Sequence, residues 1–287
     1  MKLGHLTLLC LAASSSMAGR AVAQDFEGVL AQRVLTVLPG GTARLAGEGA
    51  SDPAALLDVS AERVAALDSG LVQRQEVTIS VKGDRMRIDG IGGARGPMAG
   101  AYTLLHGSEG LAMMVMPASK RIVVITAEDA QAMAERMRAM ARQASGGGGG
   151  PAPEAAPAVS ELGERTVSGY TVRGLRVAGG GGAGEAWVAP ELLAPFARFD
   201  EANRRLRAMS PVGTSVVLDA AERLGYPLVV RTVAKAPPFM GGGQGMVLTL
   251  TEVTSVRRGP VSDDLFQVPT DYTQGSMAQM LAGPPRS

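Results

Sequence analysis

The sequence contains few of the residues on which enzymes and metal sites most often depend. Cys10 is the only cysteine, His5 and His106 are the only histidines, and aromatic residues make up 3% of the 287 residues. Cys10 and His5 lie in a segment that we expect to be removed. The mature chain is therefore expected to have no disulfide, no reactive thiol and no cysteine-bound metal. A single histidine also cannot form a metal site built on several imidazoles.

An excess of charge of one sign is missing as well. The formal net charge is +1, from 28 basic and 27 acidic residues, and subtracting Lys2 and Arg20 leaves 26 basic residues and a charge near −1. Proteins that bind nucleic acids present basic patches, and those that bind single strands add aromatic side chains for stacking. The composition therefore predicts no nucleic-acid partner.

The first 23 residues have the pattern of a secretory signal peptide. Lys2 is followed by a short apolar segment rich in Leu, Ala and Ser, and Ala21-Val22-Ala23 is an A-x-A cleavage site. The apolar run is too short and too rich in serine to span a bilayer. We therefore predict a periplasmic or secreted protein, cleaved between Ala23 and Gln24, with no transmembrane segment after signal removal.

The clearest secondary-structure pattern lies between Glu76 and Asp89. Val77, Ile79 and Val81 alternate with polar residues, as in a strand with one buried face. Gly83-Asp84 suits a two-residue turn, because glycine tolerates the positive φ of a tight hairpin. The apolar alternation resumes after this turn. This stretch predicts a β-hairpin with one apolar face and one charged face.

Similar patterns recur along the chain. Closely spaced turns separate strands at 101–106, 111–116 and 121–125, a spacing that fits antiparallel neighbours. Further strands are predicted at 26–37, 165–177, 184–188, 228–233 and 246–256, helices at 127–143, 196–208 and 214–223, and a loop at 39–53. We therefore predict an α+β fold in which a curved antiparallel β-sheet packs helices on one face. Residues 1–23 form the signal peptide, residues 24–272 one domain with a flexible Gly/Pro-rich insertion at 145–159, and residues 273–287 a disordered tail.

Four segments together resemble a known family. The stretches are VTISVKGDRMRID, YPLVVRTVA, LTLTEVTSV and the closing SDDLFQVPTDY. They are similar, in this order, to the DUF4412 family of exported bacterial proteins, whose closing signature is matched by Leu265, Phe266, Val268, Pro269 and Tyr272. That family resembles the LolA/LolB/LppX-like periplasmic lipoprotein and lipid carriers. The resemblance implies a half-barrel with helices on its concave face, and a lipid or acylated protein as partner.

The sequence offers few candidates for catalysis. His106 stands beside a Gly-Ser turn, but a catalytic histidine needs a nucleophile and an orienting carboxylate, and no Gly-x-Ser-x-Gly motif is present. The pair Asp263-Asp264 lacks the alternating oxygen ligands of a calcium loop, and Glu128-Asp129 suits the first turn of a helix. The glycine runs lack the Lys-Ser/Thr of a phosphate-binding loop, so no cofactor is predicted.

Methionine is the more suggestive residue. Met113, Met114 and Met116 lie on one predicted strand and Met133, Met137 and Met140 on one face of a predicted helix. Flexible, polarizable methionine side chains suit surfaces that accept varied apolar partners, but they also fill ordinary cores. The residues predicted to line an apolar ligand are Val77, Ile79, Val81, Met114, Met116, Met133, Met137, Met140, Leu248 and Leu250.

The leading hypothesis is a non-enzymatic, exported protein that binds or carries a lipid, an acylated protein or another apolar ligand. The alternative is a structural or protein-interaction module of the cell envelope without a small ligand. A hydrolase would require a Ser or Thr hydroxyl beside His106.

Overall fold

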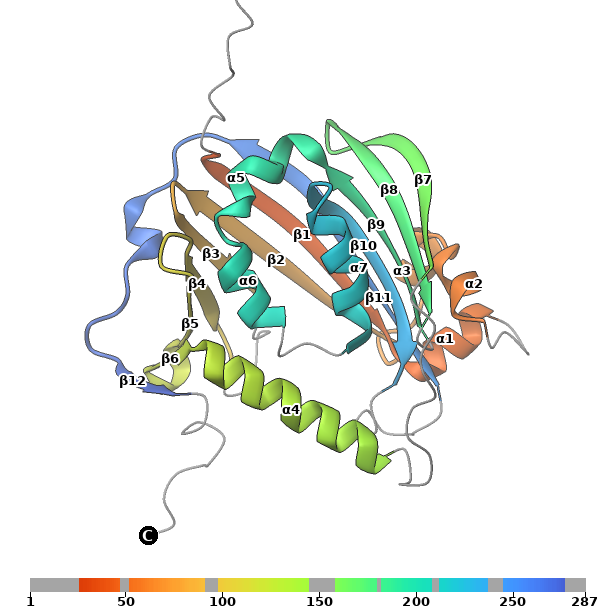
Figure 1. The fold of residues 1–287 in the computed structure, drawn as a ribbon, viewed down its shortest axis with the longest axis horizontal. Coiled ribbons are helices and arrows are strands. Elements are labelled where there is room, and N and C mark those ends of the chain that lie inside the picture. Colours follow the sequence, from red (N-terminus) through yellow and green to blue (C-terminus); the bar gives the residue numbers. More distant parts are fainter. Residues whose placement is uncertain are drawn as a thin grey trace, which may run out of the picture.

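A single curved sheet of twelve strands dominates the computed structural model (Figure 1). The structure describes residues 26–46, 52–90, 98–144, 158–179, 182–207, 212–236 and 245–276. The strand order is β12-β6-β5-β4-β3-β2-β1-β11-β10-β9-β8-β7, and the two ends of the sheet do not meet. Every pair is antiparallel except β12 with β6, which is parallel.

The strands vary in length from four to thirteen residues. They are β1 Gly28–Val37, β2 Val72–Lys82, β3 Arg85–Asp89, β4 Tyr102–His106, β5 Leu111–Met116, β6 Arg121–Ile125, β7 Ala158–Val167, β8 Tyr170–Gly179, β9 Gly182–Ala189, β10 Tyr226–Lys235, β11 Met246–Arg258 and β12 Thr273–Ser276. The α-helices are α1 Pro39–Ala46, α2 Pro53–Leu57, α3 Ala61–Ala65, α4 Ala127–Ala144, α5 Leu193–Ala197, α6 Asp200–Arg207 and α7 Val212–Glu222.

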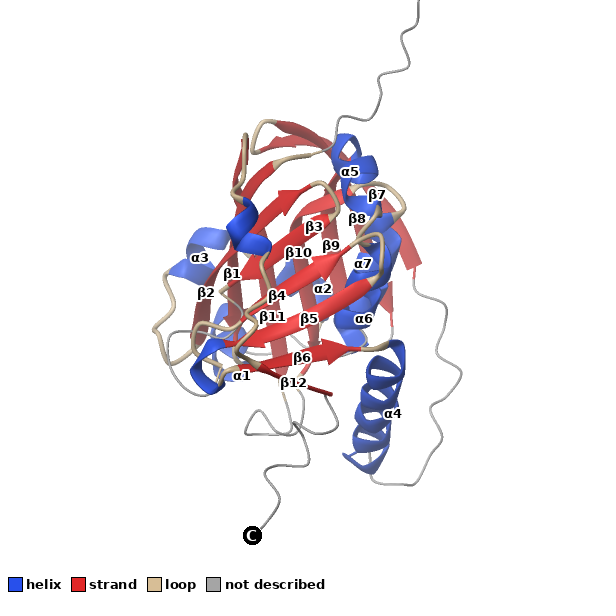
Figure 2. Ribbon diagram, turned by 90° about the vertical axis from the view of Figure 1, so that its left-hand side faces the viewer, coloured by secondary structure: helices blue, strands red, loops and turns tan. Residues whose placement is uncertain are grey.

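Helices α5, α6 and α7 lie inside the curve of the sheet, as Figures 1 and 2 both show. Val217 of α7 packs with Leu175, Ala186 and Val230 of the strands below it. Gly184 on β9 permits this close approach, because a Cβ at that position would lie 2.8 Å from the Cβ of Val217. The absence of one side chain thus sets the distance between α7 and the sheet.

Helices α1, α2 and α3 pack on the opposite face. The Thr42 hydroxyl of α1 donates to the Met246 carbonyl at 2.7 Å. Arg231 of β10 donates from Nη1 to the Leu57 carbonyl at the end of α2, at 2.8 Å. The sheet is therefore buried on both faces in its central part.

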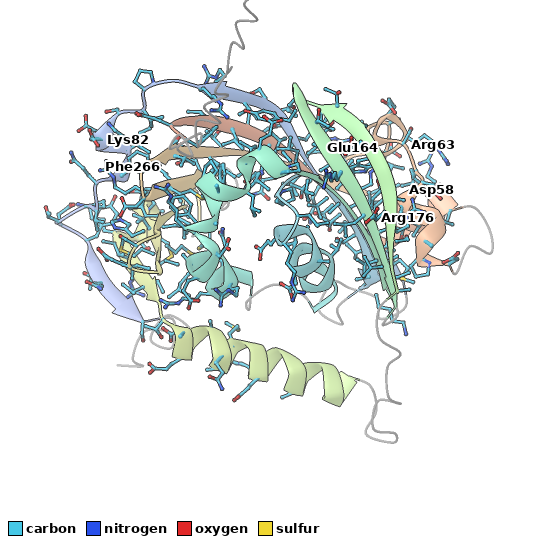
Figure 3. All side chains as sticks on the ribbon, turned by 45° about the horizontal axis from the view of Figure 1, so that its top comes forward. Asp58, Arg63, Lys82, Glu164, Arg176 and Phe266 are labelled. Atoms are coloured by element: carbon cyan, nitrogen blue, oxygen red, sulfur yellow. The ribbon has the colours of Figure 1, made fainter. Side chains whose placement is uncertain are left out.

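The closing segment lies over the outside of the sheet at its β3–β6 end. It contains the 3-10 helix η4, Asp263–Phe266, and strand β12. Tyr272 packs against the apolar cluster formed by Tyr102, Leu104, Met113, Val115 and Ile122. Figure 3 shows Lys82 and Phe266 together at this end, with Asp58 and Arg176 at the other.

The predicted fold class is confirmed, as are the hairpin β2–β3, the meander β4–β5–β6 and helix α4. Thr126 and Asp129 cap α4 reciprocally, since the Asp129 amide donates to the Thr126 hydroxyl at 3.0 Å and the Asp129 carboxylate accepts from the Thr126 amide at 3.3 Å.

Several boundaries differ from the predictions, and the helix predicted at 196–208 is divided into α5 and α6. The loop predicted at 39–53 contains α1, and the strand predicted at 165–177 is broken by a turn at Ser168-Gly169, both of which have positive φ. Residues 158–159 of the expected insertion belong to β7, and residues 273–276 of the expected tail form β12. The rest of these two segments, 145–157 and 277–287, lies outside the described residues, as does the predicted signal peptide.

Candidate functional site

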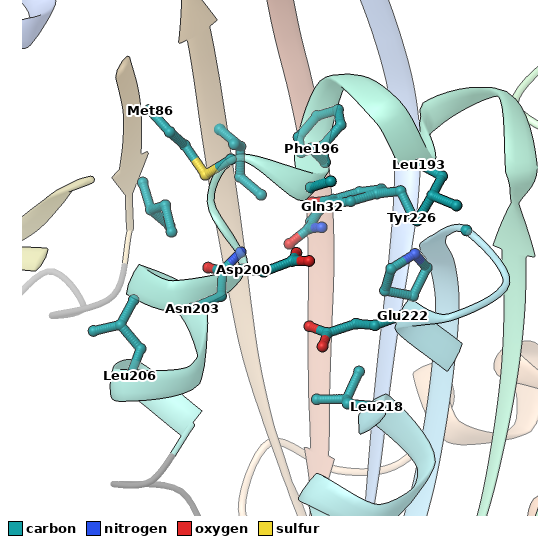
Figure 4. A pocket seen from close by; sticks show the side chains of 15 residues that line it. Gln32, Met86, Leu193, Phe196, Asp200, Asn203, Leu206, Leu218, Glu222 and Tyr226 are labelled. Atoms are coloured by element: carbon teal, nitrogen blue, oxygen red, sulfur yellow. The ribbon is translucent and has the colours of Figure 1, made fainter. Parts of the chain in front are cut away.

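A pocket of about 280 Å³ lies between the concave face of the sheet and helices α5, α6 and α7 (Figure 4). Strands β1, β2 and β3 form its floor, and the three helices form its walls. Most of its lining is apolar. These apolar residues are Ile79, Met86, Ile88, Leu193, Phe196, Ala197, Leu206, Leu218, Tyr226 and Pro227.

The strand register brings the floor residues together. Ile79 of β2 lies opposite Ile88 of β3, and Val81 lies opposite Met86. On the other side of β2, Val77 lies opposite Gln32 of β1. Directly opposite residues in an antiparallel pair point to the same face, so these side chains share the concave face.

Aromatic rings build one wall. The ring centroids of Phe196 and Tyr226 are 4.0 Å apart with an interplanar angle of 35°, and Phe26 lies 5.4 Å from Phe196. Burial raises the pKa of Tyr226, although a side-chain hydrogen bond with Gln32 acts in the opposite direction. The phenol therefore stays neutral at physiological pH.

Four polar side chains complete the lining: Gln32, Asp200, Asn203 and Glu222. Asp200 is the first residue of α6 and Glu222 the last residue of α7. Figure 4 shows the side chains of Gln32, Asp200 and Glu222 pointing toward the middle of the pocket. None of the lining residues that the structure describes is Lys, Arg or His.

This combination of a mostly apolar lining and a few converging polar groups is typical of small-molecule sites. The volume lies just below the range of roughly 300–1,000 Å³ that such sites span. The pocket can therefore hold part of a hydrocarbon chain with its polar end. No group of three or more metal-ligating side chains occurs among the described residues.

Comparison with known proteins identifies the family. The model of a domain of unknown function, DUF4412, matches residues 71–272. The chain belongs to the DUF4412 family. The match includes the hairpin, the meander, the pocket helices and η4, but begins after β1 and α1–α3 and ends before β12. No curated protein matches this chain.

Several solved structures share a distant likeness with this DUF4412 protein. An uncharacterized conserved protein from Thermus thermophilus has 10% identity and a TM-score of 0.37, over 87% of this chain and 91% of that one. PNGF-II has 10% identity and a TM-score of 0.40, over 89% of this chain but only 32% of its own. A domain from Vibrio parahaemolyticus, assigned to the outer membrane lipoprotein-sorting proteins, has 11% identity and a TM-score of 0.28, over 84% and 89%. Among the described helices, none is both long and apolar enough to cross a membrane.

The residues predicted to line a ligand fall in several places. Ile79 lines the pocket, and Val77 and Val81 share its face of β2. Met116 is buried, while Met114 and Met133 are half-buried against the main core. Leu248 and Leu250 lie on the opposite face, because they pair with Val37 and Leu35, which point away from Gln32. The side chains of Met137 and Met140 are outside the described part of the structure.

The residues that sequence reasoning missed come mainly from α5–α7. Helices were predicted in the segments that contain Phe196, Leu206, Leu218 and Glu222. That these side chains line one pocket, however, depends on how three helices lie on the sheet. No local pattern marked Asp200, because the helix predicted at 196–208 showed no break before this residue.

Several of the other candidate residues have structural partners. Asp263 accepts from Lys82 at 2.8 Å and from Arg85, and Asp129 caps α4. Ser108 donates to Asp84 at 2.7 Å, while the buried Nε2 of His106 has no hydrogen-bond partner among the described residues. The described groups around this nitrogen do not form the hydroxyl–imidazole pair that a hydrolase of this type needs.

Proposed function

We propose that this protein is a non-enzymatic binding protein of the cell envelope, exported by its signal peptide, which holds an apolar chain of a lipid or an acylated protein. The observation that carries this proposal is the pocket between α5, α6, α7 and β1–β3. It retains about 280 Å³ of space beside ten apolar side chains. A concave, mostly apolar space between helices and a sheet is the usual setting of small-molecule sites.

The physical driving force is the removal of hydrocarbon from water. Each methylene group that enters an apolar pocket contributes about 0.8 kcal/mol. The wall formed by Phe196 and Tyr226 adds flat apolar surface that needs little rearrangement when a chain enters. Membership of the DUF4412 family, a domain of unknown function, supplies no ligand.

The test is to purify the mature protein from its native envelope and to identify bound lipid by mass spectrometry after extraction. A second arm measures uptake of a fluorescent alkyl probe by the wild type and by Leu218→Trp, whose indole should fill the pocket. Leu224→Trp is the matched control, because Leu224 follows α7 and is 43% exposed.

The proposal expects a stoichiometric lipid, and probe binding that Leu218→Trp abolishes and Leu224→Trp preserves. Clean protein that also takes up no alkyl probe would overturn it. Probe binding that both variants retain would place the apolar site somewhere else.

A second candidate, docking of a protein partner without a small ligand, is favoured by strand β7. β7 is the terminal strand of the sheet, and no described strand pairs with its outer edge. Eight of its ten residues are exposed, and Val159 is 60% exposed. Such an edge can accept a strand from another protein, although the bulge between Glu161 and Gly163 interrupts it.

Photocrosslinking distinguishes the two candidates. A crosslinking residue at Val159 should form an adduct with one defined protein in the native envelope if β7 is a docking edge. The same residue at Leu224 controls for general proximity. Equal labelling from both positions, or none from Val159, would remove this candidate.

A further inference from the structure

Strand β3 contributes to the pocket with only half of its side chains. The strand is five residues long, and successive side chains of a strand point to opposite faces of the sheet. Met86 and Ile88 line the pocket, whereas Arg85 and Arg87 point to the outside of the sheet, where they contact the closing segment. A shift imposed on the outer face of β3 therefore also moves the two side chains of the pocket floor.

Helix η4 is bound to this outer face. Its Asp263 carboxylate accepts from Lys82 of β2 at 2.8 Å and from Arg85 of β3. Phe266 of η4 is 4% exposed, and the guanidinium carbon of Arg85 lies 5.1 Å from the centre of its ring. Figure 3 shows Phe266 beside Lys82. These contacts join η4 to β2 and β3, two of the three strands of the pocket floor.

The far end of the closing segment contacts a different part of the sheet. Tyr272 packs against apolar side chains of β4, β5 and β6. Asp271 accepts from Nζ of Lys120, which directly precedes β6, at 2.9 Å. Within the part of the chain that the structure describes, no pocket-lining residue comes from these three strands. The near end of the segment thus contacts the pocket floor from behind, and the far end does not.

We propose that η4 holds the pocket floor in its binding conformation, so that Asp263 and Phe266 are positioning residues for the apolar ligand. When η4 detaches, the short strand β3 loses its outer contacts, and a ligand must then order Met86 and Ile88 itself, which weakens binding. This inference rests on the proposed function, because it assumes that a ligand enters the pocket. It adds how the affinity of that pocket is set.

Coupling of this kind is reciprocal. If attachment of η4 strengthens ligand binding, a bound ligand keeps η4 attached by the same factor. The Leu265 and Gln267 amides donate to carbonyls of the same turn at 3.3 and 3.4 Å, so their hydrogen exchange reports local opening of η4. The Thr273 amide of β12, which donates to the Lys120 carbonyl at 2.9 Å, reports the far end. A merely structural role of η4 predicts no difference between the two ends when a ligand binds.

The test titrates an uncharged fluorescent alkyl probe into the full mature chain and into two ring variants. Phe266→Leu removes the ring behind β3, and Tyr272→Leu is the matched control at the far end. We expect Phe266→Leu to weaken probe binding at least roughly fivefold, the lower end of the couplings usual between two sites, and Tyr272→Leu to change it less than about twofold. Thermal unfolding gives the folded fraction of each variant, for which the affinities are corrected.

Two exposed carboxylates supply milder variants. Asp263→Asn removes the charge that binds β2 and β3, and Asp271→Asn removes the charge that binds Lys120; the two side chains are 61% and 63% exposed. Because exposed ion pairs contribute little, we expect Asp263→Asn to weaken probe binding about twofold and Asp271→Asn to leave it unchanged. This pair decides the question if Phe266→Leu does not fold.

The hydrogen-exchange arm uses the wild type with and without the probe. Bound probe should slow exchange in η4 by a larger factor than at Thr273. Equal protection of both ends, or none at η4, would contradict the coupling.

The outcomes separate this inference from the function on which it rests. If the wild type binds no alkyl probe, the proposed function fails. If the probe binds and Phe266→Leu keeps the affinity of the wild type, apolar binding stands and the positioning role of η4 is wrong. Equal losses in the near-end and far-end variants would also overturn the assignment to Asp263 and Phe266.

Discussion

Lys82 donates from Nζ to the carboxylate of Asp263 at 2.8 Å, which joins two positions 181 residues apart. Lys82 ends the first strand of the hairpin, and Asp263 begins the helix η4. Arg85 also donates to Asp263 and lies over the ring of Phe266 at 5.1 Å, and Arg87 donates to the Leu265 carbonyl at 3.0 Å. Two of the sequence stretches that resemble the DUF4412 family are therefore in direct contact with each other.

The Lys82–Asp263 pair should make stability depend on pH. Hydrogen bonds from Lys82 and Arg85 lower the pKa of Asp263 from its ordinary value of 3.8. Because the folded state holds this carboxyl proton more weakly than the unfolded chain, the pair stabilises above pH 3.8 and its contribution is lost as the pH falls through the lowered pKa. Asp263→Asn should lower the melting temperature slightly near neutral pH and have no effect at about pH 2.

The control for that experiment is Asp264→Asn. Asp264 accepts from the Gln267 amide at 2.9 Å and has no cationic partner among the described residues. High salt should also shrink the effect of Asp263→Asn, because the carboxylate is exposed. Equal effects of both variants at every pH would contradict the role of the ion pair.

Glu185→Gln should destabilise the protein by about 1–3 kcal/mol. Glu185 is 5% exposed and accepts from the Trp187 indole at 2.6 Å and from Arg176 at 2.9 Å. The amide can still accept from the indole, but the partly buried guanidinium of Arg176 then keeps only one carboxylate partner, Asp58 at 2.7 Å. Urea unfolding followed by the fluorescence of Trp187, the only tryptophan, measures the change.

Glu164→Gln is the matched control for Glu185→Gln. Its partner Arg173 lies at 3.1 Å, but both side chains are more than half exposed. Exposed pairs contribute about 0–1 kcal/mol. If Glu164→Gln lowered the free energy of unfolding as much as Glu185→Gln, burial of the carboxylate would not be what determines the loss of stability.

Ile79→Ala and Leu250→Ala should separate ligand binding from stability. Both residues are buried, and each truncation should cost about 2–5 kcal/mol of unfolding free energy. Only Ile79 lines the pocket, whereas Leu250 faces α1–α3. Titration of an alkyl probe, corrected for the folded fraction, should show changed affinity for Ile79→Ala alone. A changed affinity in Leu250→Ala would contradict the location of the site.

Gly184 lies beneath helix α7, and Gly184→Ala should weaken probe binding by displacing this helix. The new Cβ would lie 2.8 Å from Val217 Cβ, so the helix must move away from β9, at a cost of about 1–3 kcal/mol. Leu218 and Glu222 of α7 line the pocket and would move with it. Probe titration and thermal unfolding measure the two effects. Gly70→Ala, where a Cβ meets nothing within 4 Å, should change stability by less than about 0.5 kcal/mol.

Local sequence patterns predicted the elements whose causes are local. The hairpin β2–β3 follows from period-two alternation and from Gly83, whose φ of +59° suits the turn. By contrast, α1 begins with Pro39-Gly40-Gly41, a sequence typical of a loop. The Thr42 hydroxyl of this helix is held by a carbonyl 204 residues away, which no local pattern contains. Strand β7 was predicted only in part, because a strand exposed on both faces shows no apolar alternation.

Which face of each strand lies on the concave side of the sheet could not be predicted for a related reason. Alternation in β11 shows which residues share a face but not which face is concave. A bulge shifts its register against β1, where Thr254 donates to the Ala31 carbonyl at 3.2 Å. Val253 lies opposite Gln32 and Val256 lies opposite Leu30, so both are on the concave face although they are three residues apart. A shift of one residue reverses every side chain beyond it.

Strand β1 pairs with β2 on one side and with β11 on the other, so the first strand of the chain stands in the middle of the sheet. Its ion pair between Arg33 and Glu252 spans 219 residues. A ribosome makes β1 long before β11, and the central pairing of the sheet cannot form until almost the whole chain has been synthesised. Such non-local pairing slows folding, because a long loop must close before its contacts form.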